Sequence, residues 1–106
     1  MSHRVERFAS TLQQCLADII LNDIDNPDLR YVSIARVDVS PDLKNANVFI
    51  SDPLGMVENP IQQLNRAKGF IKKRLSRKMV LKYMPELMFV EYEYNDSGYT
   101  ESIDDE

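Results

Sequence analysis

The chain has few of the residues that usually carry catalytic or metal chemistry. Among its 106 residues it has no tryptophan, one histidine (His3), one cysteine (Cys15) and three isolated glycines. A single histidine and a single cysteine exclude a zinc site built from imidazole and thiolate ligands. The glycines are too scattered for a phosphate-binding loop. We therefore expect no enzyme activity, no catalytic residue, no metal and no cofactor.

Long hydrophobic runs are also missing. No apolar run exceeds four residues, which is far too short to span a bilayer. The N-terminus lacks the apolar stretch of a signal peptide, and the lone cysteine suits a reducing compartment. We therefore expect a cytoplasmic protein with no membrane partner.

The composition is typical of one small globular domain, with 43% hydrophobic and 28% charged residues. The last segment is acidic and has few apolar residues. We assign residues 1–94 to one folded domain and residues 95–106 to an acidic, flexible tail.

Acidic residues are absent from one long stretch. The segment Arg66–Lys82 holds eight of the 13 basic residues and no acid, although the whole chain has a net charge of −4. The segment Glu86–Glu106 has eight acids and no base. A merely solvated helix usually mixes both signs, because pairs of opposite charge four residues apart stabilise it. The segregation indicates a surface for a polyanion, and a face that only keeps the protein soluble remains the alternative.

The spacing of apolar residues predicts an α+β fold. It predicts a helix at 3–22, strands at 31–40 and 45–51, a second helix that starts at Pro60, and a strand at 87–94. Pro85 prevents the second helix from extending beyond Met84. A phase change at Ala35–Arg36 predicts either a bulge or a strand that is covered on both faces, and the short turn at 40–44 predicts an antiparallel hairpin. Gly69 predicts a kink or the close approach of another group. The order is α-β-β-α(kinked)-β, with a three-stranded sheet and helices packed on one face.

Four local strings resemble one known family. They are Arg4 with Arg7 at the start of the first helix, Ser40-Pro41-Asp42-Leu43 at the hairpin turn followed by Ala46 and Val48, Leu64-Asn65-Arg66-Ala67-Lys68-Gly69-Phe70 in the second helix, and Pro85-Glu86-Leu87-Met88-Phe89 at the last strand. Their order and spacing are similar to those of ribosome-binding factor A, over roughly residues 4–97. The resemblance implies a single domain like a type II KH domain, an RNA-binding module. This family replaces the usual Gly-x-x-Gly loop with an Ala-x-Gly kink, here Ala67 and Gly69.

The resemblance also implies a function. It implies a small (30S) ribosomal subunit assembly or maturation factor that binds 16S rRNA in the immature or free subunit. Such a factor assists late rRNA processing without catalysis, acts as a monomer and takes no small-molecule substrate. We expect its RNA contacts to come from Arg4, Arg7, Arg66, Lys68, Lys72, Lys73, Arg74, Arg77, Lys78 and Lys82. Contacts to phosphates supply affinity rather than sequence readout.

Two other functions remain open. The first is a protein-interaction module that uses a sheet edge or the acidic tail. The second is a general RNA-binding KH-like protein, which needs aromatic rings beside its basic residues for bases to stack on. Phe70 and Tyr83 are the candidates for that role.

Overall fold

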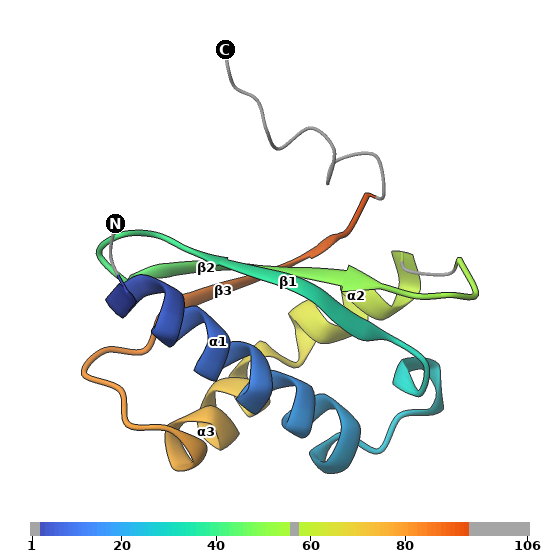
Figure 1. Cartoon of the computed structure of the whole chain (residues 1–106). Helices are drawn as coiled ribbons and strands as arrows, with labels where there is room; N and C mark the ends of the chain where they lie inside the picture. The colour runs from blue at the N-terminus through green and yellow to red at the C-terminus, as the bar shows by residue number, and fades with distance from the viewer. Residues whose placement is uncertain (1–2, 56–57, 94–106) are drawn as a thin grey trace.

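The computed structural model describes residues 3–55 and 58–93. Within them, helices cover one face of a three-stranded sheet (Figure 1). The elements are α1 (His3–Asp18), the π-helical turn η1 (Ile19–Asp23), the 3-10 turn η2 (Pro27–Leu29), β1 (Ser33–Val39), β2 (Asn45–Ser51), α2 (Glu58–Arg66), α3 (Lys68–Lys78) and β3 (Glu86–Glu91). The predicted class, the order of elements and the placement of helices on one face are confirmed.

The sheet combines an antiparallel and a parallel pair. β1 and β2 form the predicted hairpin, and β3 lies parallel to β2, so the strand order is β1-β2-β3. The register between β1 and β2 shifts between Ile34 and Arg36, which confirms the bulge. This extra residue lets Ile34 before it and Val37 after it both pack against the core.

The hairpin turn is fixed by its own polar side chains. The Ser40 hydroxyl donates to Asp42 Oδ1 over 2.7 Å, and the Lys44 backbone N–H donates to the same oxygen over 3.0 Å. These bonds favour the ionised carboxylate, so the pKa of Asp42 lies below its ordinary value, with the Ser40 bond as the main cause. Leu43 adopts a left-handed backbone conformation (φ 64°) that turns the chain into β2.

The apolar positions of every element meet in one core. α1 contributes Leu12 and Leu16, and the two helices after the hairpin contribute Leu64, Ile71 and Leu75, all fully buried. The strands bury Ala46, Val48, Ile50, Leu87 and Phe89, which have the alternation expected of strands with one covered face. Cys15 packs at the margin of this core, where burial raises the pKa of its thiol.

Several boundaries differ from the predicted ones. α3 ends at Lys78, before the limit set by Pro85, because Met79 is already extended (φ −144°, ψ 154°). α2 begins at Glu58, two residues before Pro60; a proline is tolerated there because the first N–H groups of a helix have no partner within it. β1 and β3 are shorter than the predicted strands 31–40 and 87–94. The predicted tail, 95–106, lies outside the described residues.

The interruption of the second helix is centred on Ala67. Its backbone (φ −89°, ψ 10°) leaves the helical region, and its N–H is shared between Gln63 O (3.0 Å) and Leu64 O (3.1 Å). Gly69 already lies in the first turn of α3. A Cβ atom at Gly69 would meet no atom within 4 Å, so the predicted close approach of another group of this chain is wrong.

Candidate nucleic-acid interface

The basic residues of α3 fall into two sets that face different surroundings. Ile71 and Leu75 are fully buried and fix the inner side of the helix. At 3.6 residues per turn, Lys68 and Lys72 then lie on the flank toward β3, and Lys78 lies near the end of α1. Lys73 and Arg77 fall on the side away from the core. The cations predicted to bind RNA are therefore not equivalent.

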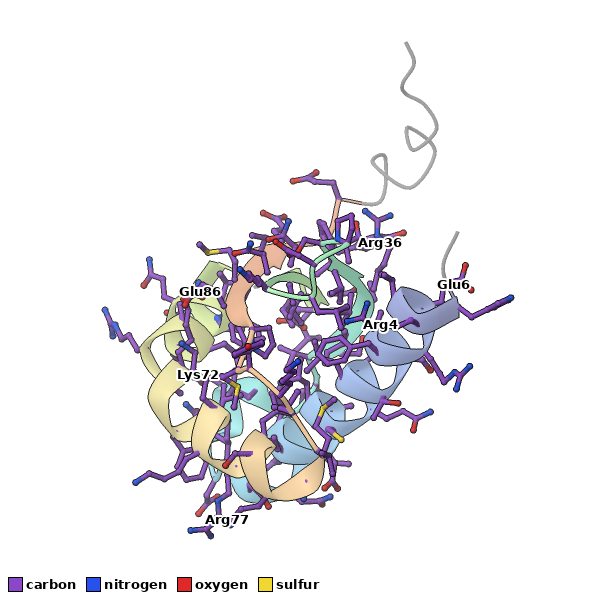
Figure 2. All side chains as sticks on the ribbon, turned by 90° about the vertical axis from the view of Figure 1, so that its left-hand side faces the viewer. Arg4, Glu6, Arg36, Lys72, Arg77 and Glu86 are labelled. Atoms are coloured by element: carbon purple, nitrogen blue, oxygen red, sulfur yellow. The ribbon has the colours of Figure 1, made fainter. Side chains whose placement is uncertain are left out.

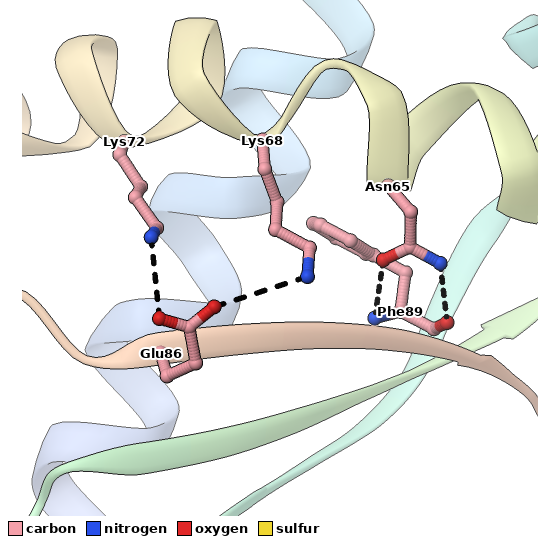
Figure 3. Close-up of polar contacts among 5 residues, drawn as sticks. All are labelled: Asn65, Lys68, Lys72, Glu86 and Phe89. Carbon is pink, nitrogen blue, oxygen red and sulfur yellow. Dashed lines mark hydrogen bonds and ion pairs between the residues drawn. The ribbon is translucent and has the colours of Figure 1, made fainter.

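Lys68 and Lys72 share one carboxylate of the sheet. Lys72 Nζ lies 3.4 Å from Glu86 Oε1, and Lys68 Nζ lies 3.9 Å from Glu86 Oε2 (Figure 3). Glu86 is the first residue of β3, so both pairs join α3 to the sheet. Solvent-exposed pairs of this kind contribute little to stability. They do reduce the positive charge that this flank presents to an anion.

Lys78 is tied to the end of α1. Its Nζ lies 2.6 Å from Asp18 Oδ2 and 3.9 Å from Asp23 Oδ2. The bond between Lys78 and Asp18 is the main cause of a raised pKa for Lys78 and a lowered pKa for Asp18. Asp18 also accepts a hydrogen bond from the Asn22 side chain. Lys78 thus has a structural contact in place of a free charge.

Four cations of the α2–α3 segment have no acidic partner in the described part of the chain, and one of them lies against an exposed aromatic ring. The Arg74 guanidinium lies 5.1 Å from the centre of the Phe70 ring, which is 40% exposed. Figure 2 shows Arg77 reaching away from the body of the protein. We call this set the outer α3 surface; its members are Arg66, Phe70, Lys73, Arg74 and Arg77.

Asn65 fastens α2 to the free edge of the sheet. Its Nδ2 donates to Phe89 O over 3.1 Å, and its Oδ1 accepts from Phe89 N over 3.2 Å (Figure 3). The backbone N–H groups of Glu86 and Tyr92 donate toward β2. Because the backbone groups of successive residues in a strand point alternately to its two sides, the N–H and C=O of Phe89 point to the open edge. Asn65 takes the place of a neighbouring strand there. It was not predicted, because its partner is 24 residues away.

The remaining predicted cations lie elsewhere. Arg4 and Arg7 are exposed on the first turns of α1 and line a groove there. In Figure 2 the connection from α3 to β3 passes between Arg4 and Lys72, and Arg77 lies at the other end of the view from Arg4. Lys82 lies in that connection, with its Nζ 5.8 Å from the centre of the exposed Tyr83 ring.

Two further features bear on the function classes considered above. Among residues 3–55 and 58–93, no three His, Cys, Asp or Glu side chains come together in a way that could hold a metal ion. Over the same residues, every helix is too short or too polar to cross a membrane.

Known proteins share both the sequence pattern and the fold. A family model described as ribosome-binding factor A matches residues 4–102. Ribosome-binding factor A of Carboxydothermus hydrogenoformans is 42% identical over 93 residues, which cover 85% of this chain and 74% of that protein.

Solved structures show the same fold. The crystal structure of ribosome-binding factor A from Thermus thermophilus has a TM-score of 0.75 at 22% identity, over 82% of this chain and 93% of that one. A Thermus thermophilus ribosome-binding factor A model fitted into the cryo-EM map of a 30S complex has a TM-score of 0.69 at 21% identity. That match covers 80% of this chain and 91% of the other.

Proposed function

Because this chain belongs to the ribosome-binding factor A family, we propose that it binds 16S rRNA in the free or immature small ribosomal subunit. In this role it assists late rRNA processing and catalyses no step itself. The fitted 30S complex of the Thermus thermophilus relative supports the choice of partner.

The outer α3 surface is the observation that carries this proposal. Four cations without an acidic partner in the described residues project from one helical segment, and Phe70 adds an exposed ring among them. Guanidinium groups bind phosphate oxygens through paired hydrogen bonds, and the cations beside them add charge attraction. Four phosphate contacts predict a slope of about −3 in a plot of log affinity against log salt concentration.

The fold holds this surface in place before RNA arrives. Asn65 joins the end of α2 to β3, and the Glu86 pairs join the start of α3 to the same strand. A surface that is already ordered loses less conformational entropy on binding. Elsewhere the chain is strongly acidic, which repels RNA and favours docking through α3.

Co-sedimentation tests this function. The purified protein is mixed with separated 30S subunits, 50S subunits and joined ribosomes at two salt concentrations. We expect binding to free 30S subunits alone, weaker at the higher salt and lost in Lys73→Glu/Arg74→Glu/Arg77→Glu. The control Arg30→Glu/Lys44→Glu reverses two exposed cations outside this surface and should bind as the wild type does.

Two results would contradict the proposal. One is no binding to any ribosomal particle, and the other is binding that salt and the triple reversal leave unchanged. An excess of unrelated single-stranded RNA serves as competitor. If it displaced the protein as readily as 16S rRNA does, the general RNA-binding alternative would replace this proposal.

A further inference from the structure

A second surface lies at the N-terminal end of α1 and differs in chemistry from the outer α3 surface. It is a groove of about 550 Å³ between α1, the hairpin turn and the connection that follows α3. We call it the α1 groove; it is lined by Arg4, Arg7, Phe8, Thr11, Leu43, Met79 and Val80.

The floor of the α1 groove is apolar and partly open to water. Val80 is 99% exposed, so its side chain makes almost no contact with the rest of the protein. Phe8 and Met79 are half-buried against the core and present their other sides to the groove. A phosphate backbone gains nothing from aliphatic side chains, whereas an apolar side chain of another protein gains from burial against them. These aliphatic side chains therefore favour a protein ligand over an RNA phosphate backbone.

The rim of the α1 groove is positively charged. Arg4 and Arg7 lie three residues apart on α1, which places them on neighbouring turns of the same face. No acidic residue lines the groove among the residues that the structure describes. Guanidinium groups form two parallel hydrogen bonds with a carboxylate as they do with a phosphate, so the apolar lining beside them decides in favour of a protein carboxylate. A segment that complements this groove would carry carboxylates for the two arginines and, next to them, an apolar side chain for the apolar lining.

We propose that the α1 groove binds an acidic segment of a small-subunit protein, with an aliphatic or aromatic side chain seated on Val80 and Met79. The inference rests on the proposed function, because the partner belongs to the particle to which the chain binds. The protein then contacts the subunit at two places, with RNA at the outer α3 surface and with protein at the α1 groove.

Val80→Asp tests the proposal without disturbing the fold, since the side chain it replaces is almost fully exposed. The matched control is Leu21→Asp, which makes a similar change at a position that is 73% exposed and does not line the α1 groove. Binding of each variant is measured to 30S subunits and to protein-free 16S rRNA. We expect Val80→Asp to weaken subunit binding at least tenfold and to leave rRNA binding unchanged, and Leu21→Asp to alter neither.

Every other result overturns the inference. Equal losses on subunits and on free rRNA would mean that the groove contacts RNA, and no loss on either would mean that it is not used. Tighter subunit binding by Val80→Asp would identify the acidic residues 95–106 of this chain as the occupant. A wild-type dimer that Val80→Asp dissociates would identify a second copy. If the wild type itself does not bind 30S subunits, the proposed function fails first and this inference fails with it.

A cross-linking experiment gives an independent reading. A photoreactive side chain is placed at position 80, and the protein is irradiated on purified 30S subunits. A cross-link to a small-subunit protein supports the proposal. A cross-link to 16S rRNA, or none while the variant remains bound, contradicts it.

Discussion

The six cations of α3 form two sets of three that differ in their partners. The first set meets acids of β3 and α1 and consists of Lys68, Lys72 and Lys78. The second set meets no acid among the described residues and consists of Lys73, Arg74 and Arg77. The first set gives the fold contacts between elements, and the second leaves its charge available to a ligand. The density of basic residues in a sequence therefore overstates the positive charge that the folded surface leaves without an acidic partner.

The largest expected effect comes from reversing the three cations without acidic partners. Lys73→Glu/Arg74→Glu/Arg77→Glu should lower the affinity for 16S rRNA by about 100-fold or more, because three contacts are replaced by repulsion, and the salt slope should become shallower by roughly 2 to 3. Filter binding at several salt concentrations measures both quantities. The matched pair of variants neutralises three cations in each set. Lys68→Gln/Lys72→Gln/Lys78→Gln should lower affinity by less than about threefold, and Lys73→Gln/Arg74→Gln/Arg77→Gln by clearly more; an equal loss would remove the distinction between the two sets.

The next effect is on stability. Asn65→Ala leaves the N–H and C=O groups of Phe89 without their partner, at a cost of about 1–3 kcal/mol in the free energy of unfolding. Urea denaturation followed by circular dichroism measures it. The RNA affinity of the folded variant should fall slightly, because Asn65 helps to hold the outer α3 surface in order. Its salt slope should stay near that of the wild type, because the cations are unchanged. A stability equal to that of the wild type would show that the edge bonds contribute nothing.

A smaller effect is expected when Lys68 and Lys72 lose their acidic partner and become free cations. Glu86→Gln removes the carboxylate that Lys68 and Lys72 share, so both ammonium groups become available to phosphate. We expect RNA affinity to rise a few-fold and the salt slope to steepen by about 1.5. The exposed acid Glu91, at the far end of β3, provides the control Glu91→Gln. A steeper slope in both variants would mean that only net charge matters.

The smallest effect concerns pH. The pKa of Asp18 is lowered in the folded protein by the bond from Lys78, so its contribution to stability is present above its ordinary value of 3.8 and is lost as pH falls through the lowered value. The pKa of Lys78 is raised, so its contribution persists below 10.5 and is lost as pH rises through the raised value. Thermal unfolding from pH 2 to 7 should show a shallower acid decline in Asp18→Asn. An unchanged decline would assign the acid sensitivity to other carboxylates.

The sequence predicts most of this fold because burial follows a simple period. The positions of the side chains that must be buried determine the local structure. Examples are the apolar stripe of α1, the alternation of Ala46, Val48 and Ile50, and the phase change at Ala35. The parallel pairing of β3 with β2 was not predicted, because no local pattern specifies which strands become neighbours.

The site was predictable only as a set of candidate residues. Eight basic residues in one stretch drew attention to the helical segment that carries the outer α3 surface. Which of these residues have an acidic partner depends on Glu86 and Asp18, which belong to other elements and meet α3 only after folding. The end of α3 at Lys78 was not predicted, since the basic and apolar pattern continues beyond Lys78, although the backbone is already extended at Met79.

The bidentate contact of Asn65 also bears on solubility. An open strand edge with unpaired backbone groups can template the addition of another chain, which is how many sheet proteins begin to aggregate. Asn65 occupies the middle of the β3 edge, at Phe89, so an incoming strand must displace a side chain that already satisfies both backbone groups. One amide thus protects a strand that has four consecutive hydrophobic residues, Leu87-Met88-Phe89-Val90. Loss of that amide would expose this edge and favour self-association of the folded protein through β3.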